Sequence, residues 1–261
     1  MPYYPKKNPL FKYKFGCEFE YSTPWQQTLD MVKPIIKKVY GSNCINANNS
    51  YFESINNKKW DLKLDGTTEC ELCTPVSKYS DLTKICKVIG SLDTKITESD
   101  SLHVHVDCGK IEKYAILAGW LKYEDVIFHL FPEHRRKNDS YCAKLIEKGK
   151  KQDLIAQFFE NAVKECESHY TALSFSQTKR TIEFRIAEGT KDPVFVYAWV
   201  NFLLYFVEYC SKLDPTVAIC KHIKEPNLQQ MISDLNIYDP KVIEWLEARR
   251  SKFRKKSKKI S

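Results

Sequence analysis

The sequence predicts an α+β fold in which helices cover one face of a mainly antiparallel sheet. Four short segments alternate apolar and ionisable residues with a period of two, as strands with one buried face do. Strand and helix candidates do not alternate regularly, which argues against a parallel βαβ fold. With 261 residues, 43% hydrophobic and 28% charged, the chain is long enough to bury a core. It contains no Gly-rich P-loop and no GxGxxG motif, which excludes the common nucleotide-binding folds that use them.

The strand candidates have an apolar residue at every second position and turn residues at their ends. They are expected at 12–21, 51–55, 60–64, the part of 65–75 that follows its turn, 101–107, 170–175 and 180–187. Asp65-Gly66 is a hairpin signal, and Pro75 ends the strand that follows. The segment "GSNCINANNS" at 41–50 is rich in turn residues and is expected to be a loop.

Helices are predicted where apolar residues recur with helical spacing. The expected ranges are 25–40, 78–91, 110–130, 151–166, 193–212, 226–235 and 240–250. The most apolar run, 193–207, is shorter than the roughly 20 residues of a membrane span and contains Asn201. We therefore interpret it as a buried core helix and expect no membrane contact.

The charge of the chain is concentrated at its C-terminal end. The formal net charge is +8, and "RRSKFRKKSKKIS" at 249–261 carries eight Lys or Arg and no acid. We expect a single catalytic domain over 1–248 and a basic, flexible tail over 249–261. Such a tail could bind nucleic acid or an acidic partner, although nucleic-acid binding is not favoured.

The first residues, "MPYYPKKNPLFKYK", lack an apolar segment, so we expect a cytoplasmic protein whose ten cysteines are mostly free thiols. Cys70 and Cys73 form the one closely spaced pair. They have no matching second pair and fall on opposite faces of a strand, so a zinc site is not favoured.

The strands that alternate share an unusual second face. They are "CEFE" at 17–20, "TECELCT" at 68–74, "SLHVHVD" at 101–107 and "TIEFRIAEG" at 181–189. In each, apolar residues point one way and ionisable residues the other. The ionisable residues are Glu18, Glu20, Glu69, Glu71, His103, His105, Asp107, Glu183 and Arg185. No lysine is expected on this face.

One interpretation is a sheet with an ordinary solvated face. The other is a metal site, because carboxylates collected on one surface repel one another and divalent cations offset that repulsion. A ligand set dominated by oxygen favours Mg²⁺ or Mn²⁺. A histidine among such ligands suggests a second role, such as contact with phosphate. Arg185 beside Glu183 suits a clamp on a phosphoryl group or a carboxylate. Together these parts are typical of nucleotide phosphoryl transfer.

Five motifs in order resemble the amidoligase family of the glutamine synthetase / γ-glutamylcysteine synthetase superfamily. They are "GCEFE", "DGTTECELCTP", "SLHVHV", "RRKNDSYC" and "TIEFRIAEGT", over roughly residues 12 to 210. The resemblance implies a glutamine synthetase-like catalytic fold, in which an antiparallel sheet holds Mg²⁺ and ATP. It also implies a carboxylate–amine ligase that phosphorylates a carboxylate and then lets an amine attack the acyl phosphate.

The resemblance also implies roles for single residues, each at a matching position. Metal ligands would be Glu20 and Glu71 at one ion, and Glu18, His103 and Glu183 at another. Contacts to the nucleotide or substrate would come from His105, Arg136, Arg180, Arg185 and Glu188. Arg185 would stabilise the transferring phosphoryl group, and Glu183 and Arg135 would take part in catalysis.

Two departures from the family pattern leave roles open. Two residues, Asp139 and Ser140, separate Asn138 from Tyr141 in the arginine loop, where the family's motif has one. Glu69 stands where a small residue is expected, and is either a third metal ligand or an exposed acid, the latter being favoured. The segments 41–50 and 132–142 are candidate lids.

The resemblance leaves the substrates open. They would be a carboxylate and an amine carried by peptides, proteins or small molecules, and the enzyme would be a monomer or a dimer. Two alternatives stay open: a phosphotransferase on the same scaffold, and a basic nucleic-acid-binding protein. The second explains the net charge but not Glu18, Glu20, Glu71 and Glu183, since acids on a binding face repel phosphate.

Overall fold

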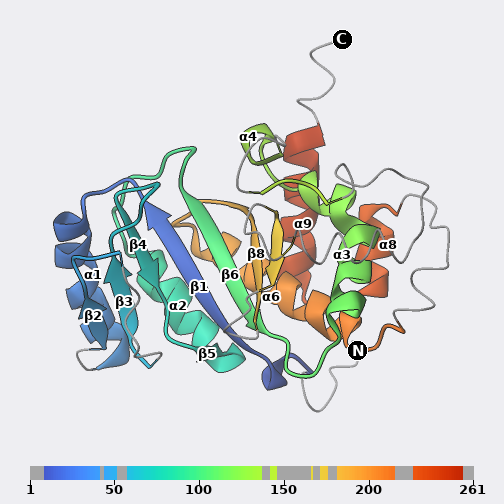
Figure 1. Ribbon diagram of the computed structural model, residues 1–261, viewed down its shortest axis with the longest axis horizontal. Helices are drawn as coiled ribbons and strands as arrows, with labels where there is room; N and C mark the ends of the chain where they lie inside the picture. Colours follow the sequence, from blue (N-terminus) through green and yellow to red (C-terminus); the bar gives the residue numbers. More distant parts are fainter. Residues whose placement is uncertain are drawn as a thin grey trace, which may run out of the picture. The chain divides into compact units, whose positions relative to one another are not determined.

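The computed structural model describes residues 9–41, 44–51, 58–136, 142–145, 166, 171–175, 181–214 and 226–254 (Figure 1). The chain divides into two compact units. The first comprises Met1–His105 and Glu188–Tyr197, and the second comprises Val106–Ala187 and Ala198–Ser261.

The first unit is built on strands in the order β2-β3-β4-β1-β6. Their bounds are β1 (Lys14–Tyr21), β2 (Ile45–Ala47), β3 (Trp60–Lys63), β4 (Cys70–Cys73) and β6 (Ser101–Asp107), which enters the second unit after His105. The short β5 (Ser77–Lys78) pairs with the start of β1. β4 is antiparallel to both β1 and β3, whereas β2 is parallel to β3.

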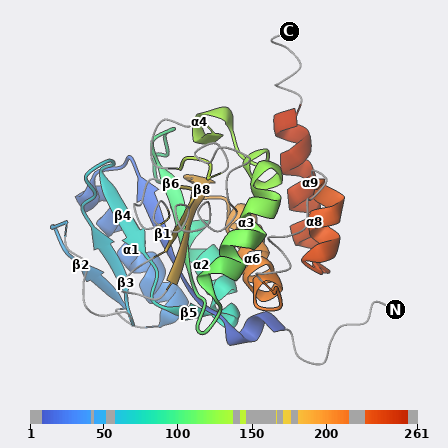
Figure 2. The same cartoon turned by 45° about the vertical axis from the view of Figure 1, so that its right-hand side comes forward.

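Two helices pack behind these strands, α1 (Trp25–Tyr40) and α2 (Leu82–Ile89) (Figures 1 and 2). Short 3₁₀ turns precede β1 (η1, Pro9–Lys12) and α2 (η2, Tyr79–Asp81). Tyr21 lies opposite Cys70 in the β1–β4 ladder, and the Cys70 thiol contacts the Thr28 hydroxyl of α1 at 3.4 Å. The apolar face of the sheet therefore faces the helices, and its ionisable face points away from them.

The second unit is mainly helical. It contains α3 (Lys113–Phe128), α4 (Glu133–Arg136), the antiparallel pair β7 (Leu173–Phe175) and β8 (Thr181–Glu188), α6 (Pro193–Cys210) from Ala198 onward, α8 (Leu228–Asp234) and α9 (Pro240–Arg254). Its core joins Trp120, Phe184 and Phe206, whose ring centroids are 5.7 to 6.0 Å apart. The contacts of Phe206 with Trp120 and with Phe184 are edge-to-face, a geometry that stabilises aromatic cores.

α6 is long and apolar enough to cross a membrane by length and composition, but 78% of it is buried within the protein. Burial on this scale is what a core helix requires, as the sequence predicts. Among the described residues, α6 is the one helix that passes this test.

Most predicted elements are confirmed, and the sheet is mostly antiparallel. Two predictions are wrong. The range 41–50, expected to be a loop, contains β2. The expected tail begins too early, because α9 continues to Arg254 and buries Arg249. The Arg249 Nε donates to the Leu130 carbonyl at 2.7 Å, and its guanidinium lies over the ring of Phe131.

The predicted strand at 51–55 (apart from Tyr51) and helix at 151–166 (apart from Cys166) lie outside the described residues. The expectations of a single domain over 1–248 and of helices on one face of the whole sheet stay predictions. All nine cysteines of the described part are free thiols. Cys70 and Cys73 do occupy opposite faces of β4, since Cys73 contacts Glu71 while Cys70 contacts α1.

Candidate active site

Strand register brings three ionisable residues side by side on the first unit. Glu71 on β4 lies opposite Glu20 on β1 and opposite Lys63 on β3. All three side chains are buried. Because each strand turns these residues to the same face, the two carboxylates and the ammonium form one row across the sheet.

Asp65 joins this row from the turn between β3 and β4. Its carboxylate accepts hydrogen bonds from the backbone N–H groups of Thr67 (2.7 Å) and Thr68 (3.0 Å), an arrangement that shapes the turn. Burial opposes its charge, but a hydrogen bond from the Thr67 hydroxyl and the two backbone bonds more than offset burial and lower the Asp65 pKa. One oxygen each from Glu20, Asp65 and Glu71 lie within 4.8 Å of one another, close enough to hold one cation.

Lys63 is the charge that sequence reasoning missed on this face. Its Nζ lies 3.0 Å from Glu71 Oε1, so the expectation of a face without lysine is wrong. Burial and the nearby Glu18 raise the pKa of Glu71 to about 7, against the opposing effect of Lys63. Burial disfavours the charge of Lys63, but Glu71 and Cys73 outweigh it and raise the Lys63 pKa.

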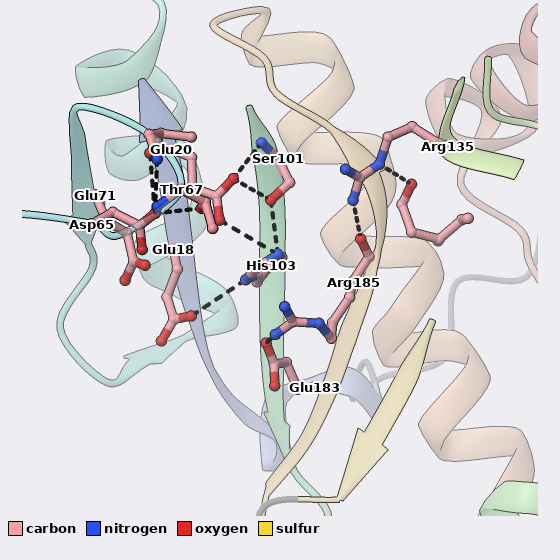
Figure 3. A network of polar contacts seen from close by, with 12 residues as sticks. Glu18, Glu20, Asp65, Thr67, Glu71, Ser101, His103, Arg135, Glu183 and Arg185 are labelled. Carbon is pink, nitrogen blue, oxygen red and sulfur yellow. Dashed lines mark hydrogen bonds and ion pairs between the residues drawn. The ribbon is translucent and has the colours of Figure 1, made fainter. Parts of the chain in front are cut away.

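A second group lies where β1 meets β6. Glu20 Oε2 accepts from the Ser101 backbone N–H (2.8 Å) and hydroxyl (2.6 Å). The Ser101 hydroxyl also contacts His103 Nε2 at 2.8 Å (Figure 3). On the other side of the imidazole, His103 Nδ1 is 3.7 Å from Glu18 Oε2.

Glu18 lies between two histidines, because His105 Nε2 is 3.1 Å from Glu18 Oε1. Burial raises the pKa of Glu18, but His105 and His103 outweigh that effect and hold it well below its usual range. Glu18 is therefore a carboxylate at neutral pH and can accept a cation or a proton donor.

Cys73 also reaches this face. Its thiol donates to Glu71 Oε1 at 2.9 Å, and Glu18, Glu71 and Cys73 form a further group whose ligand atoms lie within 4.8 Å of one another. Burial, then Glu71 and Glu18, raise the pKa of the thiol well above its ordinary value. The sulfur is therefore protonated, and is a hydrogen-bond donor rather than a thiolate ligand.

The second unit carries the predicted arginines. On β8, the Arg185 guanidinium forms an ion pair with Glu183. Arg135 at α4 is buried and donates to the Arg185 carbonyl (2.6 Å) and the Ile186 carbonyl (3.3 Å). Arg135 thus holds the backbone of the strand that presents Arg185. Within the described residues, Arg136 Nε is buried without a hydrogen-bond partner.

Several predicted residues fall elsewhere. Arg180 and the loop residues Asn138 to Tyr141 lie outside the described part of the chain. Glu69 is exposed and is not in the carboxylate group, where Asp65 stands instead. Glu188, the last residue of β8, belongs to the first unit.

The comparisons with known proteins decide the family. The sequence profile of the family described as "Putative amidoligase enzyme" matches residues 12–207, which is most of the chain. The protein belongs to this amidoligase family. A search of the curated proteins found no match in sequence.

Among solved structures, the chain is similar to the complex between the prokaryotic ubiquitin-like protein Pup and its ligase PafA. The identity is 11% and the TM-score 0.41, and the match covers 95% of this chain and 65% of that one. The chain thus spans less than two thirds of the length of that structure.

Three residues of the amidoligase site escaped prediction: Lys63, Asp65 and Ser101. Asp65 and Ser101 each lie at an end of a predicted strand, where a polar residue is interpreted as part of a turn or as the start of the strand. Lys63 sits at an alternating position of β3, so the period of two could have placed it, as it placed Cys73 beside Glu71 on β4.

Proposed function

We propose that this amidoligase is an ATP- and Mg²⁺-dependent carboxylate–amine ligase that forms an amide bond through an acyl phosphate. The observation that carries the proposal is the group of Glu20, Asp65 and Glu71, whose oxygens lie within 4.8 Å of one another. Glu20 and Glu71 are buried and Asp65 is half-buried, and carboxylates at this spacing repel unless a cation lies among them. In an enzyme of the amidoligase family, such a cation would take part in the reaction of ATP with a carboxylate.

The donor set fits a hard divalent cation. Its atoms are carboxylate oxygens, and Mg²⁺ and Mn²⁺ prefer oxygen ligands. Glu20, Asp65 and Glu71 would hold one ion. Glu18 and His103 would be two of the ligands of a second ion, and Glu183 stays a predicted third ligand of it. Bound cations would neutralise phosphate oxygens and the charge that develops during phosphoryl transfer.

The remaining predicted residues would act on the anionic groups of ATP and substrate. His105, Arg136, Arg180 and Arg185 are proposed contacts of the nucleotide. The buried Nε of Arg136, without a partner among the described residues, is a donor suited to an oxygen of such an anion. Arg185 would stabilise the transferring phosphoryl group, and Glu183 would orient its guanidinium through their ion pair.

The attacking amine must be neutral, which bears on Lys63. The pKa of Lys63 is raised by Glu71 and Cys73 despite burial, so its nitrogen stays an ammonium. Lys63 is therefore not the acceptor amine, and we propose that it neutralises part of the carboxylate group. The amine and the carboxylate would come from peptides, proteins or small molecules. We further propose a cytoplasmic enzyme that works as a monomer or dimer.

Calorimetry of ATP binding with and without Mg²⁺ tests the proposal. We expect binding that requires Mg²⁺ and is lost in Glu20→Gln/Glu71→Gln, while the exposed-acid control Glu69→Gln binds like the wild type. Binding of ATP without Mg²⁺, or equal binding by the double variant and the control, would contradict it.

Product analysis separates the ligase from the phosphotransferase. Carboxylate candidates are screened for ADP release in the presence of hydroxylamine, a small amine that captures acyl phosphates as hydroxamates. A ligase gives hydroxamate in step with ADP. A phosphotransferase would instead release ADP at the same rate with and without hydroxylamine and would leave a phosphorylated product when the amine is omitted.

A further inference from the structure

Ser101 is a buried residue that joins two groups of the proposed cation site. Its side chain is 3% exposed and lies at the start of β6, two residues before His103 on the same face. Glu20 Oε2 accepts hydrogen bonds from the Ser101 hydroxyl (2.6 Å) and from the Ser101 backbone N–H (2.8 Å). The same hydroxyl oxygen is 2.8 Å from His103 Nε2 (Figure 3).

The number of available protons fixes which atom donates in each hydrogen bond between His103, Ser101 and Glu20. A serine hydroxyl has one proton to donate, and an ionised carboxylate can only accept. The 2.6 Å separation between Ser101 and Glu20 matches a hydrogen bond to a charged acceptor. The hydroxyl proton therefore belongs to the bond with Glu20. Ser101 Oγ must then accept from His103, which requires a proton on Nε2.

The neighbouring distances support this assignment. His103 Nε2 is 3.7 Å from Glu20 Oε1, so Ser101 at 2.8 Å is the nearer partner. Glu18 divides its two oxygens between the imidazoles, with Oε1 3.1 Å from His105 Nε2 and Oε2 3.7 Å from His103 Nδ1.

We propose that Ser101 is a positioning residue that holds neutral His103 in the Nε2–H tautomer and so directs the Nδ1 lone pair toward Glu18. This inference rests on the proposed cation site. In this tautomer, Nδ1 and Glu18 Oε2 are both acceptors and repel unless a cation lies between them. His103 would then serve the ion of Glu18 through Nδ1, whereas Glu20 would turn its Oε1 to the ion of Asp65 and Glu71. Ser101 thus separates two neighbouring cation positions.

The tautomer can be measured without any metal. In the full chain labelled with ¹⁵N-histidine, long-range ¹H–¹⁵N correlations distinguish the two tautomers, and they are recorded at increasing pH until the His103 shifts no longer change. His103→Gln assigns the signals. We expect the Nε2–H pattern for His103 in the wild type and in Ser101→Thr, which keeps a hydroxyl. Ser101→Ala should show a mixture or the Nδ1–H form.

Two results would overturn the inference: an Nδ1–H tautomer in the wild type, or an unchanged Nε2–H tautomer in Ser101→Ala. The wild-type spectrum decides the first point even where Ser101→Ala does not fold.

Mg²⁺ titration by calorimetry then tests the consequence for the cation. Loss of a residue that orients a ligand typically weakens metal binding by about 10- to 100-fold, so we expect this of Ser101→Ala. Ser101→Thr should bind like the wild type. Equal Mg²⁺ affinity in Ser101→Ala would overturn the positioning role. A wild type with the Nε2–H tautomer that binds no Mg²⁺ would leave the tautomer assignment standing and contradict the proposed function instead.

Discussion

At the scale of single residues, the cluster of carboxylates in the first unit includes one positively charged side chain, Lys63. The Lys63 ammonium lies 3.0 Å from Glu71 and is buried with it. Without such a charge, Glu18, Glu20 and Glu71 would share one low-dielectric surface with little to offset their repulsion. Lys63 therefore stabilises the protein without metal and competes with a cation for Glu71.

Replacing Lys63 by methionine should separate these two effects. We expect Lys63→Met to lower the melting temperature of the metal-free protein and to enlarge the rise in melting temperature on adding excess MgCl₂, because Mg²⁺ no longer competes with the ammonium. Thermal unfolding with and without MgCl₂ measures both. The exposed-lysine control Lys110→Met should behave like the wild type. A smaller Mg²⁺ effect in Lys63→Met would show that Lys63 helps to build the site.

The pKa of Glu71, about 7, predicts how cation binding depends on pH. Burial raises it, so Glu71 binds a proton more tightly in the folded than in the unfolded chain. Its contribution to metal-free stability is complete below its ordinary value and is lost as pH rises through about 7. Cation binding has the opposite sign, since it requires the ionised carboxylate.

We therefore expect Mg²⁺ affinity to fall by roughly tenfold per pH unit below pH 7 and to level off above it, one proton being displaced. Calorimetric titrations between pH 6 and pH 8 check this. The exposed-acid variant Glu69→Gln should keep the same profile. A flat profile in the wild type would mean that Glu71 is not a ligand.

At the scale of elements, the close approach of α3 and α6 in the second unit depends on Gly119. A Cβ placed on Gly119 would lie 2.6 Å from Cys210 Sγ, closer than packed atoms approach. Gly119→Ala should therefore destabilise the protein by about 1–3 kcal/mol, the usual cost of overpacking a core. Urea unfolding measures this loss.

The control for this prediction is Gly66→Ala, since a Cβ at Gly66 meets nothing within 4 Å. It should leave stability within about 0.5 kcal/mol of the wild type, as surface substitutions usually do. Shortening the opposing side chain, in Gly119→Ala/Cys210→Ala, should recover part of the loss. If the double variant loses more free energy of unfolding than the two single variants lose together, the direct contact is disproved.

The elements that could be predicted from the sequence are those with a clear period. The alternation in β1, β4, β6 and β8 located Glu18, Glu20, Glu71 and His103 on one side of their strands. What local pattern cannot supply is register, and register brings Lys63 on β3 beside Glu71. β2, with three residues, is too short for its period to outweigh the turn residues around it. Arg249 reads as part of a charge run, yet its guanidinium packs on Phe131 and Phe253.

At the scale of the whole molecule, the net charge of +8 and the carboxylate group point to different partners. Four lysines follow the last described residue of α9, at 255, 256, 258 and 259. Removing 255–261 would lower the formal net charge from +8 to +4. α9 itself would be kept, including Arg249, which is part of the core of the second unit.

This truncation distinguishes a nucleic-acid-binding protein from a ligase with a basic end. For the ligase, truncation should leave Mg²⁺-dependent ATP binding unchanged, because the proposed ligands lie outside the deleted segment. Truncation should strongly weaken the binding of a single-stranded oligonucleotide, because it removes lysines that contact phosphates. Fluorescence anisotropy from low to moderate salt measures this binding, and its salt dependence should also become smaller. Glu20→Gln/Glu71→Gln should do the reverse, losing ATP and keeping the oligonucleotide. Oligonucleotide binding that survives truncation and is displaced by ATP would place nucleic acid on the ionisable face and favour the binding protein over the ligase.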